Sequence, residues 1–129
     1  MVWVDYVVSC NATEGECIVN VRGDAHYMSE SGMRASACVE FIAQSYGFTS
    51  IVHRVNKDPN SKPLTRAFLA SIGDAVFAQP AAIAKVKAGD ELRVKISNTR
   101  TRGSITAFKG AVLHGSTVLC ECDMKVFSE

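Results

Sequence analysis

The stretch MRASACVEFIAQSYG, residues 33–47, decides the fold of this chain. Its apolar side chains follow one another with few interruptions, and its length and alanine content predict a helix over residues 33–46 rather than a strand. Ser31 stands where an N-cap is expected, and Gly47 is a residue type that commonly ends a helix. A helix that is apolar around nearly its whole circumference cannot lie on a surface, so the rest of the chain must cover it.

Strand patterns flank this helix on both sides. Residues 2–9 and 17–21 predict an N-terminal hairpin, because both are rich in β-branched and aromatic side chains and a turn lies between them. Beyond the helix, about four long strands are predicted from one long apolar run and from segments in which apolar and polar side chains alternate. The clearest of these segments are 64–77, 92–97 and 118–126. Turn signals at residues 88–90, 102–104 and 114–116 predict that the strands follow one another as hairpins.

Two polar stretches separate these elements, a loop over residues 22–32 and a surface loop over residues 56–63. The order is therefore two strands, one apolar helix and about four antiparallel strands. A single sheet of six strands is large enough to wrap the helix. We expect an α+β fold, a long central apolar helix wrapped by a six-stranded antiparallel sheet, in a single domain spanning residues 1–129.

Composition excludes several classes of protein. The chain has 129 residues, 47% of them hydrophobic and 21% charged, with a net charge of +1. These values are typical of one ordinary globular domain, and the balance of charge excludes a strongly basic nucleic-acid binder. No run approaches a membrane helix, and the first residues lack the pattern of a signal peptide, so we expect a cytoplasmic protein with no membrane association. Five cysteines without an export signal predict reduced thiols rather than disulfides.

The polar exceptions on the helix are the first candidates for chemistry. Ser36, Glu40 and Gln44 are four residues apart and form one narrow polar stripe. If the stripe is buried, Glu40 is a carboxylic acid held away from water, which stays neutral at pH 7 and can donate a proton. If instead the stripe faces solvent at a gap in the sheet, Glu40 is an ordinary surface carboxylate. Helix chemistry alone leaves both interpretations open.

Histidines supply the second candidate. His26 lies in the polar loop before the helix, where its ring can reach the first helical turn, and a histidine can abstract a moderately acidic carbon-bound proton. His53, after the predicted helix, and His114, at a hairpin turn, are interpreted as ordinary surface residues. No spacing typical of a metal site, a serine hydrolase elbow, a P-loop or a dinucleotide fingerprint is present, so we expect no metal.

The segment HYMSESGMRASACVEFIAQ, residues 26–44, resembles the active-site segment of the hotdog-fold β-hydroxyacyl-acyl-carrier-protein dehydratases. In that family a histidine is followed fourteen residues later by a glutamate on the central helix and then by an Ala-Gln pair. The resemblance continues over residues 66–103 and over FKGAVLHGSTVLCECDMKVF, residues 108–127. It is greatest to the short, divergent branch associated with aryl polyene biosynthesis clusters, and it implies one hotdog domain.

The resemblance implies a mechanism and roles for four residues. The activity would be a hydro-lyase reaction that converts a 3-hydroxyacyl thioester into a trans-2-enoyl thioester in fatty-acid or polyene-type synthesis. His26 would remove the proton next to the thioester carbonyl, and Glu40 would protonate the departing hydroxyl. The backbone N–H of Ala35, which stands where the family has glycine, would stabilise the thioester oxygen, and Gln44 would orient Glu40.

The resemblance also implies ligands and partners. The acyl chain would lie in an apolar tunnel beside the helix, for which we name Phe68, Leu69 and Ile72 as lining candidates. The substrate would be carried on the phosphopantetheine of acyl carrier protein or on coenzyme A, and no cofactor would be needed. In the family, the histidine and glutamate of one site come from opposite subunits, so a homodimer, a heterodimer with another hotdog subunit or a higher assembly is expected.

An acidic carrier protein needs a basic docking surface, and the middle of the chain is its candidate. Residues 51–105 carry ten of the fourteen basic side chains and four of the thirteen acidic ones. The docking candidates are Arg54, Lys57, Lys62, Arg66, Lys85 and Lys87.

Two alternatives to the dehydratase remain: a hotdog thioesterase that uses the helix carboxylate, and a noncatalytic acyl-binding subunit. His26 discriminates between dehydratase and thioesterase, because a thioesterase does not need this histidine. The intact pair of His26 and Glu40 argues against a noncatalytic subunit.

Overall fold

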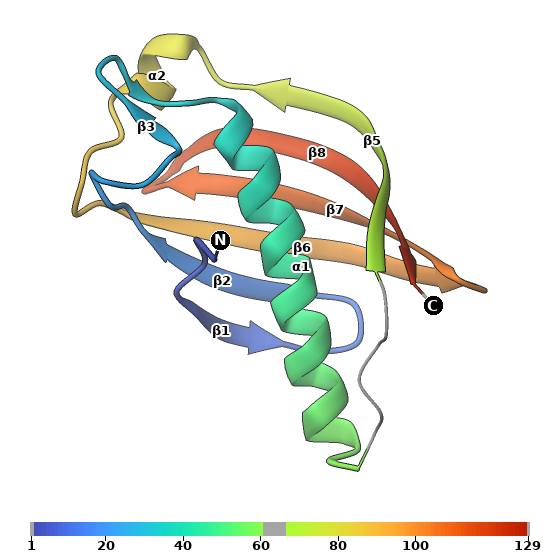
Figure 1. The fold of residues 1–129 in the computed structure, drawn as a ribbon. Helices are drawn as coiled ribbons and strands as arrows, with labels where there is room; N and C mark the ends of the chain where they lie inside the picture. Colours follow the sequence, from blue (N-terminus) through green and yellow to red (C-terminus); the bar gives the residue numbers. More distant parts are fainter. Residues whose placement is uncertain (1, 61–66, 129) are drawn as a thin grey trace.

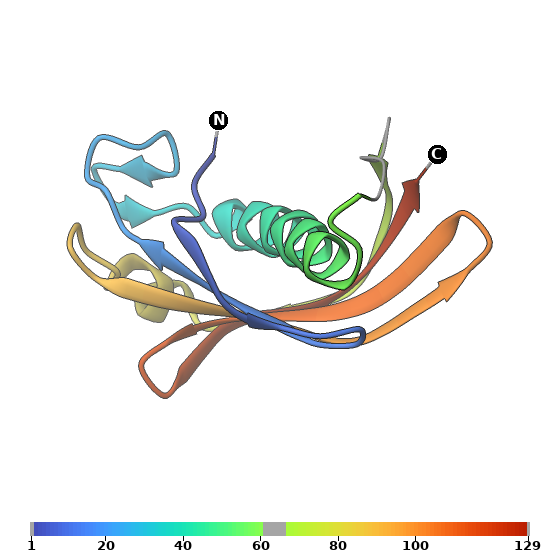
Figure 2. The same ribbon diagram turned by 90° about the horizontal axis from the view of Figure 1, so that it is seen from below.

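One long helix lies in the concave face of a curved six-stranded antiparallel sheet (Figures 1 and 2). This computed structural model describes residues 2–60 and 67–128. The strand order across the sheet is β1-β2-β6-β7-β8-β5, and every neighbouring pair is antiparallel. The strands are β1 (Tyr6–Cys10), β2 (Gly15–Asn20), β5 (Ala67–Phe77), β6 (Glu91–Arg102), β7 (Ile105–His114) and β8 (Thr117–Ser128). The helix is α1 (Ser36–Lys57). The predicted α+β architecture is confirmed.

The core lies between the helix and the concave face of the sheet. On α1, the buried residues Ala37, Cys38, Phe41 and Ile42 recur at helical spacing, so one face of the helix packs inward. The strands contribute alternate residues, as period-two patterning requires. These include Cys17 and Val19 on β2, Leu92, Val94 and Ile96 on β6, Phe108 and Val112 on β7, and Cys120, Cys122, Met124 and Val126 on β8.

A glycine in the sheet sets how closely the helix approaches. A Cβ built on Gly110 of β7 would lie 2.1 Å from Cγ2 of Ile42, a distance that real atoms do not tolerate. The absence of a side chain at position 110 therefore lets α1 settle directly onto the centre of the sheet.

The helix is longer than the sequence predicted. It begins after Ala35 rather than near Ser31, and it runs through Gly47 to Lys57. Beyond the glycine, Thr49 is buried and Phe48 packs against the core. Tertiary contacts thus carry the helix past a residue whose intrinsic helix penalty is only about 1 kcal/mol. The prediction that His53 comes after the helix was therefore wrong, because it lies inside α1.

The path from β5 to β6 also differs from the prediction. These strands are not a hairpin: β5 pairs with β8 at one edge of the sheet, whereas β6 lies between β2 and β7. The chain crosses between them through residues 78–90, which include the short helix α2 (Pro80–Ala84). The other three predicted hairpins, β1–β2, β6–β7 and β7–β8, are confirmed. Gly103 and Gly115 have positive φ angles of 62° and 61°. Such angles suit tight turns and favour glycine.

The two predicted loops are partly structured. Residues 22–32 contain most of a small hairpin of β3 (Met28–Ser29) and β4 (Gly32–Met33). The loop predicted over residues 56–63 begins only after α1 ends at Lys57, and residues 61–63 lie outside the described residues. No helix in the described part of the chain is long and apolar enough to cross a membrane.

Candidate active site

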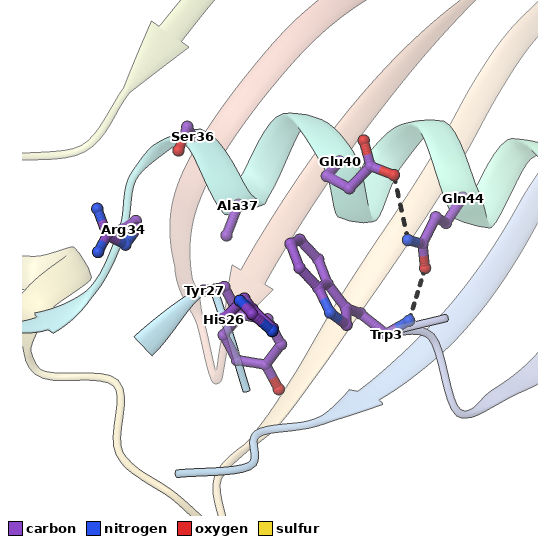
Figure 3. A pocket seen from close by; sticks show the side chains of 8 residues that line it. All are labelled: Trp3, His26, Tyr27, Arg34, Ser36, Ala37, Glu40 and Gln44. Carbon is purple, nitrogen blue, oxygen red and sulfur yellow. Dashed lines mark hydrogen bonds between the residues drawn. The ribbon is translucent and has the colours of Figure 1, made fainter. Parts of the chain in front are cut away.

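A pocket of about 350 Å³ opens beside the N-terminal half of α1. Its size is within the range of small-molecule sites. Three segments that are distant in the sequence form it: the first residues of the chain, the loop before the helix, and the helix itself (Figure 3). Its lining residues are Trp3, His26, Tyr27, Arg34, Ser36, Ala37, Glu40 and Gln44. The two principal candidates from the sequence, His26 and Glu40, therefore lie on the same pocket.

The helix presents the predicted polar stripe to this pocket. Ser36 and Glu40 are exposed and Gln44 is partly buried, so within one chain the stripe faces solvent rather than the core. Of the two interpretations of Glu40, the single chain therefore shows the exposed one. Nε2 of Gln44 donates a hydrogen bond of 3.1 Å to Oε1 of Glu40, one helical turn away. This is the contact through which Gln44 can orient the carboxyl group.

The loop that carries His26 is fixed by the residue that follows it. Tyr27 is 1% exposed, and its hydroxyl accepts a 3.0 Å hydrogen bond from the backbone N–H of Arg22. Its carbonyl accepts a 2.8 Å bond from the backbone N–H of Arg34. Both ends of the loop are thereby tied to one buried tyrosine, which leaves the His26 side chain exposed at the pocket.

His26 and Glu40 do not contact each other within the chain. No hydrogen bond or ion pair joins the two residues in the described ranges, and Figure 3 draws the indole of Trp3 between them. Trp3 packs edge-on against Tyr27 and Phe41, with ring centroids 4.9 and 5.9 Å apart. No pattern in the sequence pointed to Trp3, because its neighbours at the pocket are more than twenty residues away along the chain.

The start of the helix is open. Ala35 is the N-cap residue, has helical backbone angles and is exposed, and no side chain caps the helix. The residues on either side of it, Arg34 and Ser36, line the pocket, whereas Ala35 itself is not among the lining residues. The positive end of the helix dipole lies here and attracts negative charge, so this end of α1 suits an oxyanion.

The remaining predicted site residues either do not line this pocket or have side chains outside the described part of the structure. Phe68 and Leu69 belong to β5, but their side chains are outside the described part of the structure. Ile72 is 45% exposed and is paired with Met124, a core residue. Paired residues share a face of the sheet, so Ile72 lies on the helix side but away from the pocket.

The predicted docking residues are scattered over the described structure. Lys57, Lys85 and Lys87 are exposed and Arg54 is partly buried, whereas Lys62 and Arg66 lie outside the described residues.

Cysteines form a second group of ionisable side chains, in the core. Burial raises the pKa of the Cys38 and Cys120 thiols to about 12, with the neighbouring Cys122 as a further cause for both. Burial likewise raises the pKa of Cys17 and of Cys122. These thiols are therefore neutral and unreactive at pH 7. Among the described residues, no group of three or more His, Cys, Asp or Glu side chains is placed to hold a metal.

The long helix wrapped by a six-stranded antiparallel sheet, with its polar stripe facing a pocket, defines a hotdog-fold protein, as comparison with solved structures shows. The chain belongs to the ApeP-like family, because the family model described as ApeP dehydratase matches residues 1–129. The resemblance inferred from residues 26–44 is thereby confirmed. No curated protein sequence matches the chain.

Solved structures share the fold at low sequence identity. The dehydratase heterocomplex ApeI:P from Xenorhabdus doucetiae is 17% identical with a TM-score of 0.83, and the match covers 99% of this chain and 83% of that one. A hypothetical thioesterase with coenzyme A from Streptococcus pneumoniae is 10% identical with a TM-score of 0.69, over 96% and 84%. The protein smu.793 from Streptococcus mutans, bound to acetyl CoA, is 13% identical with a TM-score of 0.68, over 98% and 88%.

Proposed function

We propose that this chain is a 3-hydroxyacyl-thioester dehydratase that forms trans-2-enoyl thioesters in fatty-acid or polyene-type synthesis. The observation that carries the proposal is that a loop histidine, His26, and a helix carboxylate, Glu40, are both exposed at the pocket beside the start of α1, where a substrate can reach them. Membership of a dehydratase family supports the same chemistry. Acid and base side chains suffice for this elimination, so the reaction requires no metal or cofactor of its own.

The elimination balances with two side chains. His26 takes the proton from the carbon next to the thioester carbonyl, and the electrons of that bond form the new double bond. The bond from the next carbon to its hydroxyl breaks as Glu40 supplies a proton, so the hydroxyl leaves as water. The Ala35 N–H and the positive end of the helix stabilise the charge that develops on the thioester oxygen. Transfer of a proton through solvent from the histidine to the carboxyl group of the same site restores the starting state.

We infer that a second hotdog subunit completes the site. The similar structure from Xenorhabdus doucetiae is a dehydratase heterocomplex, and this chain leaves apolar side chains and a strand edge uncovered. Strand β5 is an edge strand, and its residues 71–77 are all exposed. On α1, Ile51 and Val55 are 54% and 51% exposed on successive turns. Exposed apolar side chains on a helix and an unpaired strand edge are both features that proteins normally cover.

The partner also explains the separation of His26 from Glu40. In the proposed assembly, His26 of one subunit shares a site with the helix carboxylate of the other subunit, so it does not need to reach past Trp3 to Glu40 of its own chain. Substitution Ile51→Glu is expected to lower the mass measured by light scattering and to reduce activity. Asn56→Glu adds the same charge to an exposed polar position of the helix and is expected to change neither. An unchanged mass and activity in Ile51→Glu would contradict the assembly.

We propose acyl carrier protein as the substrate carrier, docked on the exposed cations Lys85 and Lys87. The double substitution Lys85→Glu/Lys87→Glu is expected to raise KM about tenfold for an acyl-carrier-protein substrate and to leave KM unchanged for the matching coenzyme A thioester, which lacks the acidic protein. Equal KM values for wild type and variant with both substrates would contradict docking at these lysines. We further propose that the acyl chain runs beside α1 past Phe68, Leu69 and Ile72.

The decisive assay follows two products at once. The purified protein is incubated with 3-hydroxyacyl and 2-enoyl thioesters, and their interconversion is measured together with thiol release. We expect interconversion without thiol release, and a loss of at least about a hundredfold in His26→Ala and Glu40→Gln, because general acid or base catalysis contributes that much. Thiol release without enoyl formation would show a thioesterase, and full activity in His26→Ala would remove the assigned base.

A further inference from the structure

The first residues of the chain are hydrogen-bonded to the candidate acid through one amide side chain. Oε1 of Gln44 accepts the backbone N–H of Trp3 at 2.8 Å and that of Val4 at 3.3 Å. Nε2 of the same amide donates to Oε1 of Glu40 at 3.1 Å. Figure 3 shows the chain of contacts from Trp3 through Gln44 to Glu40.

These contacts fix the orientation of the Gln44 amide. Only its oxygen can accept from two backbone N–H donors, so the amide nitrogen must face Glu40. If the amide turned over, its NH₂ group would face two donors and its oxygen would face the carboxyl group. The backbone of residues 3 and 4 therefore determines that Glu40 meets a donor rather than an acceptor.

The first segment is held firmly enough to impose this orientation. Val4 is 6% exposed and belongs to the core, and the Trp3 ring packs against Tyr27 and Phe41. The backbone N–H of Asp5 donates to the carbonyl of Ile18 at 2.9 Å, which ties the segment to β2. Its two donors therefore occupy fixed positions relative to α1.

We propose that the backbone amides of Trp3 and Val4 are positioning groups for the acid Glu40, acting through Gln44. This inference rests on the proposed dehydratase function for its catalytic meaning. Gln44 donates to Oε1 of Glu40, and the carbonyl oxygen of a carboxylic acid is a better acceptor than its hydroxyl oxygen, so a protonated Glu40 carries its hydrogen on Oε2. Figure 3 shows this second oxygen turned away from Gln44. The proton is thus kept on the oxygen that is available to a departing hydroxyl, instead of being shared with a neighbouring amide.

A proline scan of the first segment isolates the N–H. Trp3→Ala and Trp3→Pro both remove the indole, but only proline removes the backbone donor. We expect kcat to be about tenfold lower in Trp3→Pro than in Trp3→Ala with a similar KM, because orientation of an acid acts on the chemical step. In a Gln44→Ala background the two variants should have the same kcat. A difference that persists without Gln44 would overturn the proposal, since the effect would then bypass the amide.

Val2→Pro is the matched control for proline strain. Val2 is exposed, and its N–H donates no hydrogen bond to any part of the chain that the structure describes. This variant should retain wild-type kcat. A loss equal to that of Trp3→Pro would assign the effect to chain stiffness and would also overturn the proposal.

A measurement on the resting protein separates this inference from the proposed activity. Amide hydrogen exchange at Trp3 is followed by NMR in wild type and in Gln44→Ala, with Asp5 as the internal reference. Without its acceptor on Gln44, the Trp3 amide should exchange at least about tenfold faster, while Asp5, bonded to Ile18, is unchanged. Equal Trp3 exchange in both proteins would refute the contact. Faster exchange in a protein without dehydratase activity would uphold the contact and reject its catalytic meaning.

Discussion

Adding one methyl group at the centre of the sheet should displace helix α1 from its close packing on β7. The perturbation is Gly110→Ala on β7. The new Cβ would lie 2.1 Å from Cγ2, 3.0 Å from Cγ1 and 3.1 Å from Cβ of Ile42, whereas ordinary carbon contacts begin near 3.4 Å. Ile42 is fully buried and β-branched, so it has no alternative rotamer to adopt within the helix. The helix itself must move to relieve the contact.

The expected change in the free energy of unfolding of Gly110→Ala is the sum of two opposing contributions. Overpacking a core typically destabilises by about 1–3 kcal/mol, and this contact is among the tightest a methyl can make. Replacing glycine within a strand recovers about 0.5–1 kcal/mol through the unfolded chain. We therefore expect Gly110→Ala to lower the free energy of unfolding by about 2 kcal/mol, measured by urea denaturation at constant m-value.

A double-mutant cycle assigns this loss to Ile42. Ile42→Ala alone should cost about 2–5 kcal/mol, because it leaves a cavity under the helix. In that background the alanine at position 110 meets only the Cβ of residue 42, so its own cost should largely disappear and the two substitutions should be strongly non-additive. Additive losses of stability, or a Gly110→Ala protein as stable as wild type, would refute the close packing of α1 against Gly110.

Further substitutions and conditions test other parts of the structure. Gly47→Ala should stabilise the protein by about 0.5–1 kcal/mol in a thermal or urea melt, since Gly47 is helical and a Cβ there has open space. Ser45→Ala should raise stability by about 1 kcal/mol, because the buried Ser45 hydroxyl has no hydrogen-bond partner in the described structure. The free energy of unfolding should fall as pH rises from 9 toward 12, because the Cys38 and Cys120 thiols have a pKa near 9 when unfolded and about 12 when folded. This fall should be weaker in Cys38→Ala, which lacks one of the two thiols. In the native protein at pH 8, Cys10 should be the one thiol that reacts readily with a disulfide reagent, whereas all five should react in denaturant.

Local patterns in the sequence predicted the elements and their type. Period-two alternation identified β6 and β8, and the apolar run from residue 33 identified the central helix. The His26–Glu40 spacing indicated both the family and two residues of the pocket. These features are local, so each can be interpreted from a short window without knowledge of the rest of the chain.

Non-local contacts explain what the sequence did not predict. Gly47 resembles a helix terminator, but the packing of Phe48 and Thr49 on the sheet outweighs its small intrinsic penalty. The pairing of β5 with β8 rather than β6 depends on which sheet edge the chain reaches, which no turn motif encodes.

The site itself shows the same division. Sequence by itself placed a histidine before an apolar helix and a glutamate on it, and thereby supplied the two candidates for acid and base. Only the tertiary structure decided that the backbone N–H of Trp3, forty-one residues before Gln44, orients the Gln44 side chain and through it the Glu40 carboxyl group. The physical reason is that hydrogen-bond partners are chosen by proximity in space, which the packing of the whole sheet against the helix determines.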